Sequence, residues 1–382
     1  MNALRLCKVI LPLLLLTGCW SKVEINEQMF VFAIFIDKGE QPDSVEVTLG
    51  SPLPNRLSPG KQTGGSNDGT PYTMINKTGN SIPETINAIQ RDATRQLDFS
   101  HTRVVVISRE FAESGIRDVL DWILREPSLN FSSFLLASEG KAKQIAELAP
   151  VFEQMPSSVL MRFEVLNNAL ATTARDCLFG MLGGQGFALT YVNSELKPLL
   201  SEKEKLERWT GIEGAALFHK DKMKGVMSEK ETKALAWALN HIRKPLYTVT
   251  WDGGKSKASV LFINTKAKKE LHMTDSGPAF TVKLKGTGDL ILLKDSGNRT
   301  PVEVNKIITH ELEQMIRTDM ENALRVTKEL GTDVLQFGNM IEAKYPKIWS
   351  EFVVNWDDRY KDDIQIDVKT KIMVRHSGAS TS

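Results

Sequence analysis

The feature that most constrains this chain is one short apolar run near its N-terminus. Arg5 and Lys8 give the start a positive charge, and residues 9–16 are aliphatic except for Pro12. A helix needs roughly 20 apolar residues to cross a bilayer, so this run is too short to span one and is typical of an export signal. After residue 19 no stretch approaches about 18 consecutive apolar residues, which predicts a globular body outside the membrane.

The apolar run ends in a sequence that has the form of a bacterial lipobox. Leu16-Thr17-Gly18-Cys19 follows it directly. In lipobox chemistry the Cys thiol is alkylated with diacylglycerol, and the signal, here residues 1–18, is cut off just before that Cys. We therefore predict that Cys19 becomes a lipidated N-terminus, with an uncleaved anchor or an ordinary secretory signal as alternatives. Two acyl chains hold a protein at a membrane far more durably than one.

The composition is ordinary and excludes several classes of protein. Of 382 residues, 41% are hydrophobic and 25% charged, and the formal net charge is +1. Neither bulk disorder nor electrostatic attraction to nucleic acid is expected from these values. Three cysteines are too few for a secreted disulfide scaffold. Cys7 leaves with the signal and Cys19 is modified, so Cys177 has no partner and is predicted to be a buried, inert thiol.

Strand and helix patterns alternate along the first half of the chain. Apolar runs predict strands at 30–36, 45–49, 104–107, 131–137 and 187–192. Amphipathic spacing predicts one helix that begins after the N-cap Ser81, and three more at 115–124, 141–148 and 158–173. Residues 50–71 are rich in Gly, Pro, Ser and Asn, which is typical of a long mobile insertion. The alternation predicts α/β layers around one sheet.

The second half of the chain begins after a charged linker, residues 201–208. A hairpin is predicted at 214–227, and a helix follows that Ser228 and Glu231 cap. Further predictions are strands at 247–251, 259–263, 280–284 and 364–374, helices at 304–330 and 346–352, a turn at 337–338 and an acidic solvated turn at 357–363. The fold class is therefore α+β, with three unlike domains at 19–200, 209–300 and 301–376 and a tail at 377–382.

No motif in the sequence indicates catalysis or metal binding. The six histidines form no H-E-x-x-H pair, because His310-Glu311 is followed by Gln at position 314. No G-x-S-x-G elbow is present, and adjacent carboxylates such as Asp357 and Asp358 point apart. We predict no catalytic residue, no metal ion and no cofactor besides the diacylglyceryl lipid on Cys19. Residues 266–269 are the densest basic group and predict an exposed strand end that touches solvent or anionic headgroups.

Four groups of short segments then recur in a familiar order along nearly the whole chain. They are Cys19-Trp20 with 24–26 and 34–37, residues 101–108 with 115–121, residues 214–218 with Lys222 and Gly225, and residues 333–338 with 344–349 and 355–356. Together they resemble the Ger(x)C family, the C-subunit lipoproteins of spore germination receptors.

The resemblance implies a non-enzymatic subunit that is lipid-anchored through Cys19 to the outer face of the inner spore membrane. It implies two integral membrane partner subunits, one of them transporter-like, and a receptor that responds to small nutrient germinants. It also implies a fold of three mixed α/β domains. The main alternative is a substrate-binding lipoprotein of a small-molecule importer, which predicts two similar lobes. A lipid-anchored envelope hydrolase is a third alternative, and no motif favours it.

Overall fold

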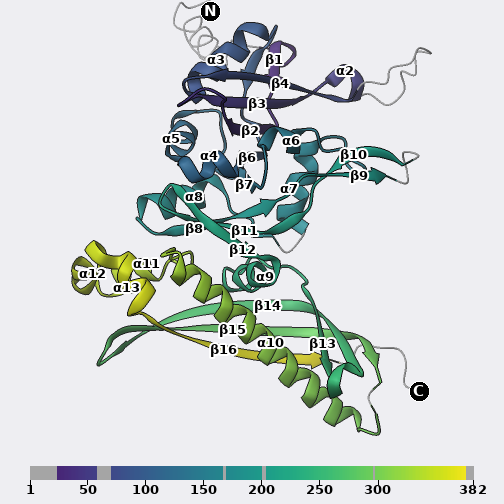
Figure 1. Cartoon of the computed structure of the whole chain (residues 1–382), viewed down its shortest axis with the longest axis vertical. Helices are drawn as coiled ribbons and strands as arrows, with labels where there is room; N and C mark the ends of the chain where they lie inside the picture. The colour runs from purple at the N-terminus through teal and green to yellow at the C-terminus, as the bar shows by residue number, and fades with distance from the viewer. Residues whose placement is uncertain (1–23, 58–69, 167–168, 200–203, 296, 376–382) are drawn as a thin grey trace, which may run out of the picture.

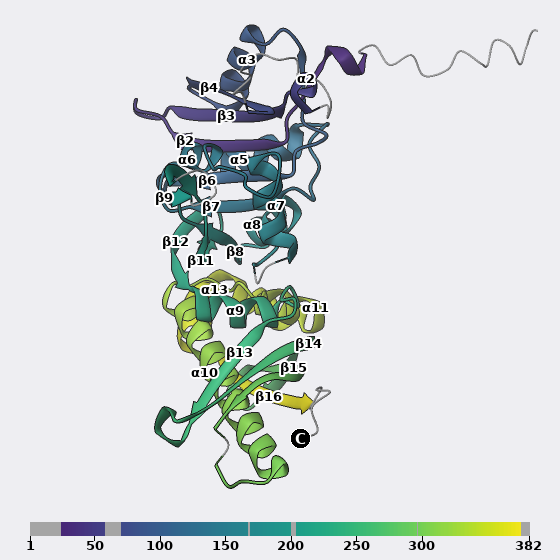
Figure 2. The same ribbon diagram turned by 90° about the vertical axis from the view of Figure 1, so that its right-hand side faces the viewer.

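The computed structural model describes residues 24–57, 70–166, 169–199, 204–295 and 297–375. The molecule is elongated, and two bodies follow one another along its long axis (Figures 1 and 2). The first body, residues 24–228, is built on an eight-stranded sheet, and the second, residues 229–375, on a four-stranded sheet. Helices pack on both sheets, which confirms the α+β class. Within the described ranges no helix is both long and apolar enough to cross a membrane.

The sheet of the first body is mixed, with parallel strands at its centre. Its strand order is β12-β11-β8-β7-β6-β2-β3-β4. The central parallel strands are β2 (Ala33–Lys38), β6 (Val104–Ser108), β7 (Phe134–Ser138) and β8 (Gly186–Val192). The flanking antiparallel strands are β3 (Val45–Pro52), β4 (Tyr72–Gly79), β11 (Ile212–His219) and β12 (Lys222–Ser228). The central strands are buried on both faces, as their unbroken apolar runs predict.

Helices cover both faces of this sheet. One face packs on α3 (Ile82–Asp92), α4 (Arg109–Ser114), α5 (Arg117–Arg125) and α8 (Ala174–Leu182). The other face packs on α6 (Ala142–Ala146) and α7 (Pro156–Leu166). The shorter elements of the body are η1 (Ile25–Glu27), β1 (Gln28–Phe30), α2 (Pro54–Leu57), β5 (Gln96–Asp98), β9 (Glu195–Leu199) and β10 (Lys205–Trp209).

The second body is a long hairpin extended by one strand on each side. Its order is β13 (Leu246–Trp251), β14 (Ser256–Thr274), β15 (Gly277–Lys294) and β16 (Gln365–Arg375), with η3 (Asp252–Gly254) after β13. Two helices pack on one face of the sheet, α9 (Glu229–Ala238) and α10 (Pro301–Glu329). The remaining elements are α11 (Phe337–Lys344), α12 (Pro346–Phe352), η4 (Val353–Asn355) and α13 (Trp356–Asp362). They form a helical cluster at the end of the sheet that faces the first body (Figure 1).

Local capping signals are confirmed. The Ser81 hydroxyl accepts a hydrogen bond from the backbone N–H of Glu84 and begins α3. Ser228 and Glu231 form a reciprocal capping box at the start of α9. The predicted long helix is α10, whose buried face repeats at helical spacing and includes Ile308, Leu312 and Met320.

Several expectations about loops are wrong. In the insertion expected at 50–71, residues 50–52 end strand β3 and residues 54–57 form α2, and residues 205–208 of the expected linker lie in β10, which pairs with β9. The expected turn at Phe337-Gly338 is the first turn of α11. The expected acidic turn is helix α13, because Trp356 and Tyr360 lie four residues apart and bury one face of it. Of the 50–71 insertion, residues 58–69 lie outside the described part of the chain.

Strand pairing crosses both internal boundaries of the expected three domains. The hairpin β11–β12, expected in the middle domain at 209–300, pairs with β8 of the first sheet. Residues 215–218 are buried on both faces, so β11 needs a sheet neighbour on each side and layers above and below it. In the same way β16, expected in the C-terminal domain at 301–376, pairs in parallel with β15. The described residues thus form two sheet-based bodies.

Candidate functional site

The predicted lipidation site, Cys19, lies outside the described residues, so its modification stays a prediction. The described chain begins at Glu24, and β1 follows within a few residues. In Figure 1, β1 lies at the end of the molecule far from the four-stranded sheet. The described chain therefore begins at one tip of the long axis.

Each described histidine has a neighbouring side chain or carbonyl as a partner. Five of the six lie in the described ranges, and His376 lies outside them. They contact the following partners: His101 with Phe32, His219 with Asp357, His241 with the Leu170 carbonyl, His272 with Glu270 and His310 with Gln314. No group of three or more His, Cys, Asp or Glu side chains in the described part of the chain is placed to hold a metal ion.

Cys177 has the environment of an inert thiol. It lies on α8 with no exposed surface and packs in the core of the first body. Burial, with a smaller effect of Asp176, raises the pKa of the thiol well above its ordinary value. A thiol that stays protonated is a poor nucleophile. The predicted burial of Cys177 is confirmed.

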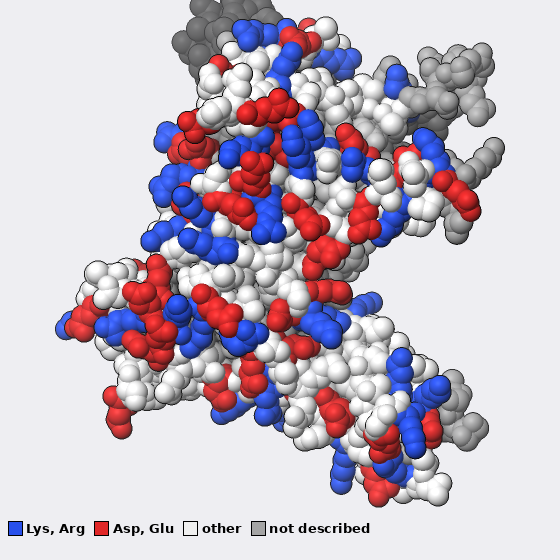
Figure 3. Space-filling view, in the orientation of Figure 1, with Lys and Arg blue, Asp and Glu red and all other residues white. Residues whose placement is uncertain are grey.

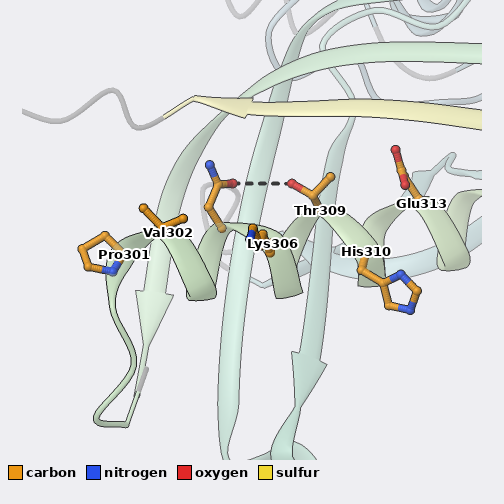
Figure 4. Close-up of a pocket in the computed structure, with 7 residues that line it drawn as sticks. Pro301, Val302, Lys306, Thr309, His310 and Glu313 are labelled. Atoms are coloured by element: carbon orange, nitrogen blue, oxygen red, sulfur yellow. Dashed lines mark hydrogen bonds between the residues drawn. The ribbon is translucent and has the colours of Figure 1, made fainter.

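A groove along the first half of α10 has a volume of about 400 Å³. Two of its polar residues bond to the neighbouring strand β16. Asn305 Nδ2 donates to the carbonyl of Val374 at 3.3 Å, and Glu313 Oε1 accepts from the N–H of Ile372 at 2.9 Å. Figure 4 shows His310 and Glu313 on opposite sides of the helix, with Thr309 bonded to Asn305. The groove therefore holds no acid–base pair.

An apolar hollow of about 290 Å³ lies beside α7. Phe163, Leu166 and Trp209 line it, and Phe152 at its rim is 92% exposed. Its ion pair joins Arg162 and Glu153 at 3.5 Å. The hollow offers apolar contact area, and its lining brings no nucleophile next to a base.

The fourth group of resemblance segments lies where the two bodies meet, a region that we call the junction. The junction comprises the start of β8, the hairpin β11–β12, the end of α10, and helices α11 and α13. Gln185 Nε2 donates to Asn339 Oδ1 at 2.5 Å, and His219 Nε2 lies 3.1 Å from Asp357 Oδ2. Each contact joins a residue of the first body to a residue of the second.

Asp333 organises the junction from inside. Its carboxylate is 2% exposed and accepts hydrogen bonds from the N–H groups of Phe337 at 2.9 Å and Gly338 at 2.8 Å, so it caps α11. Burial raises the pKa of Asp333 to about 6, although these two hydrogen bonds act to lower it. The nearby Lys269 ammonium donates to the Leu335 carbonyl at 2.6 Å. Lys269 thus lies against the core side of β14. The predicted exposed strand end at 266–269 is wrong, because these residues lie in the middle of β14, although Lys266 and Lys268 are exposed.

The close packing around Gly338 explains why this position needs a glycine. A Cβ at this position would lie 2.7 Å from the ring of Trp349 and 2.8 Å from Gln185 Nε2. Trp349 in turn packs edge-on against Trp356, with ring centroids 5.2 Å apart. The fourth group of resemblance segments is therefore a structural part of the junction. Asp333 lies before the N-cap position of α11, so the ordinary capping spacing in the sequence does not reveal its role.

Charge does not mark a nucleic-acid site on the face shown in Figure 3. Basic and acidic residues are intermixed there over both bodies. This pattern agrees with the near-zero net charge of the sequence.

Comparisons with known proteins agree along both halves of the chain. A family model described as spore germination protein N-terminal domain matches residues 21–194. A second, described as spore germination B3/GerAC like, C-terminal, matches residues 213–378. Spore germination protein KC of Bacillus subtilis (strain 168) is 24% identical over 97% of this chain and 94% of its own length. The putative spore germination protein YfkR of the same organism is 25% identical over 97% and 96%.

A solved structure shares the fold. The crystal structure of the GerBC protein superposes with a TM-score of 0.57 at 17% identity, over 90% of this chain and 98% of that chain.

Proposed function

The chain belongs to the Ger(x)C family of spore germination proteins, and from this we propose that it is a lipid-anchored, non-enzymatic subunit of a nutrient germinant receptor. The observation that carries the proposal is the match of both domain models, in order, behind a lipobox that ends in Cys19. The receptor sits in the inner spore membrane, with this subunit on the outer face. Its partners are two integral membrane subunits, one of them transporter-like.

Anchoring supplies a physical role for the lipid. A protein held at the membrane by its first residue shares a thin layer with the membrane subunits, and its effective concentration there is high. Weak contacts with those subunits then become populated without a large interface. The elongated shape supports this role, because a lipid at one tip lets the second body reach away from the bilayer (Figure 2).

The absence of catalysis is part of the proposal. Among the described side chains there is no group placed for a metal ion, and the described histidines have structural partners. The hollows beside α7 and α10 bring no nucleophile and base together. These observations support a subunit that transmits or organises a response through contacts.

The test is the variant Cys19→Ala, compared with Cys177→Ala as the control for the other cysteine of the processed chain. We expect Cys19→Ala to leave the membrane fraction and to abolish the nutrient response of spores, while its thermal unfolding stays that of the wild type. Cys177→Ala is expected to remain in the membrane fraction. Fusing an unrelated membrane-spanning helix to the Cys19→Ala chain should restore the response. Membrane retention and normal germination of Cys19→Ala would contradict the proposal.

The alternative of an importer's substrate-binding lipoprotein needs two similar lobes around a hinge. The two bodies differ, because one has an eight-stranded mixed sheet and the other a four-stranded sheet. Calorimetric titration with amino acids and sugars would reveal a ligand if this alternative held.

A further inference from the structure

Three lysines line one hollow on the face of the four-stranded sheet that α9 and α10 leave uncovered. Lys266 lies on β14, Lys285 on β15 and Lys371 on β16, and the hollow between them has a volume of about 290 Å³. The inward neighbours Leu284 and Ile372 are buried in the core under α10. Side chains alternate along a strand, so the three lysines point to the opposite, open face.

The strand register places the three lysines side by side. Lys266 is paired with Lys285 across the antiparallel ladder, and Lys285 with Lys371 across the parallel one. Neighbouring strands lie roughly 4.8 Å apart, so the three backbone positions form one short row across the sheet. We call Lys266, Lys285 and Lys371 the lysine row.

This arrangement opposes folding. Like charges directly opposite each other on a sheet are destabilising. All three side chains are exposed, and none of the three ammonium groups has an ion pair or hydrogen bond among the described residues. A row that weakens the sheet and contributes nothing to its core indicates a role outside folding.

The next row along the same face shows how the chain neutralises lysines where no ligand is needed. Lys268, Lys283 and Lys369 are paired across the same three strands. Glu270 lies 3.0 Å from Lys268 and 2.6 Å from Lys283, and Asp367 lies 3.4 Å from Lys369. The ammonium groups of Lys283 and Lys268 lower the pKa of Glu270 to about 2. Among the residues that the structure describes, no carboxylate forms an ion pair with the lysine row.

We propose that the lysine row binds a small oxyanion that carries two or more negative charges, such as a diphosphate or a polycarboxylate. Three ammonium groups neutralise such a ligand with charge-assisted hydrogen bonds. Asn264 and Thr287 also line the hollow, and their side chains, which bond to no other described residue, supply an amide and a hydroxyl donor. The size of the hollow suits one small molecule. The proposal rests on the lysine row and is independent of the lipid anchor.

The test is calorimetric titration of the full-length protein in detergent micelles with inorganic pyrophosphate, at an ionic strength held constant with chloride. We expect one site per chain, and a loss of affinity of about tenfold or more for Lys285→Gln, the central lysine. The matched control is Lys369→Gln in the neutralised row, which should change the affinity by less than about twofold.

Lys285→Gln removes the repulsion between Lys285 and the two neighbouring lysines, so this variant should melt at the same temperature as the wild type or higher. A loss of binding in the variant would then not be due to unfolding. No binding of pyrophosphate to the wild type would overturn the proposal. Equal weakening by Lys285→Gln and Lys369→Gln would also overturn it, because binding would then follow general surface charge. If the protein is retained on phosphatidylglycerol vesicles and pyrophosphate does not change this retention, the oxyanion proposal is overturned and the lysine row contacts a membrane surface instead.

Discussion

At the scale of single residues, a buried carboxyl group makes the stability of this protein depend on pH. Glu164 on α7 is 3% exposed, and its Oε2 accepts a hydrogen bond from the Ala171 N–H at 2.7 Å. Its Oε1 is buried without a partner in the described chain. Burial raises the pKa of Glu164 to about 7. The helix that carries Glu164 is predicted from sequence, but its burial is not, because the covering residues come from other elements.

The raised pKa predicts a pH-dependent stability. In the unfolded chain a Glu titrates near pH 4.3, so between there and pH 7 the native state keeps a proton that the unfolded state has released. The contribution of this carboxyl to stability is full below about pH 4.3 and is lost as the pH rises through about 7. We expect Glu164→Gln to be more stable than the wild type by about 2–4 kcal/mol at pH 8 and by only about 1 kcal/mol at pH 5.

Urea unfolding of both proteins at the two pH values checks this prediction. Glu40→Gln, at an exposed position without an ion pair in the described chain, is the control and should change neither curve. A stability difference that is the same at pH 5 and pH 8 would show that Glu164 ionises as it does in water.

At the scale of elements, α10 protects the open edge of the second sheet. β16 pairs with β15 on one side only, and an unpaired strand edge is a template for unwanted pairing. The Glu313 carboxylate accepts from the Ile372 N–H, and Thr370 Oγ1 donates to the Glu313 carbonyl at 3.1 Å. The helix thus occupies hydrogen-bonding groups of an edge that would otherwise face solvent.

Removing the side-chain acceptor should expose that edge. We expect Glu313→Ala to destabilise the protein by about 1–2 kcal/mol, because the Ile372 N–H loses its partner in a partly buried place. Glu313→Gln keeps a carbonyl acceptor and should lose less. Denaturant unfolding gives the difference, and light scattering reports association through the open edge. Equal effects of Ala and Gln would mean that the hydrogen bond does not stabilise this edge.

At the scale of the whole molecule, the junction couples two bodies with separate sheets. The bodies are joined by the direct connection of β12 to α9, by apolar packing, and by polar contacts such as Gln185–Asn339 and His219–Asp357. Buried side chains of both bodies, such as Leu217 of β11 and Leu235 of α9, belong to one hydrophobic core. The polar contacts of the junction therefore add to an apolar contact between the bodies.

Loosening the polar contacts of the junction should destabilise the protein. We expect the double variant Asn339→Ala/Asp357→Asn to lower the melting temperature by about 2–4 °C, as for a loss of about 1 kcal/mol. Differential scanning calorimetry measures this shift. Asp358→Asn, one position along α13 on the exposed side, is the control. A double variant whose transition matches the control would show that these polar contacts do not stabilise the protein.

Local features could be read from the sequence. The caps at Ser81 and Ser228, the long helix α10 and the buried central strands follow from patterns within single elements, and the lipobox at Cys19 stays a prediction. Order and spacing of short motifs also sufficed to indicate the family, because they span nearly the whole chain. In each case the signal lies within a single element or in the order of the motifs along the chain.

Only the tertiary structure decided which distant residues meet. It placed β11 beside β8, against the expected boundary at 200–209, and it assembled the lysine row from strands whose residues lie up to 105 positions apart, 371 − 266. Strand register depends on which faces are buried in the complete core, so a single strand's pattern cannot name its neighbour. The burial of Glu164 and Asp333 has the same origin, since desolvation is produced by everything that packs around a group.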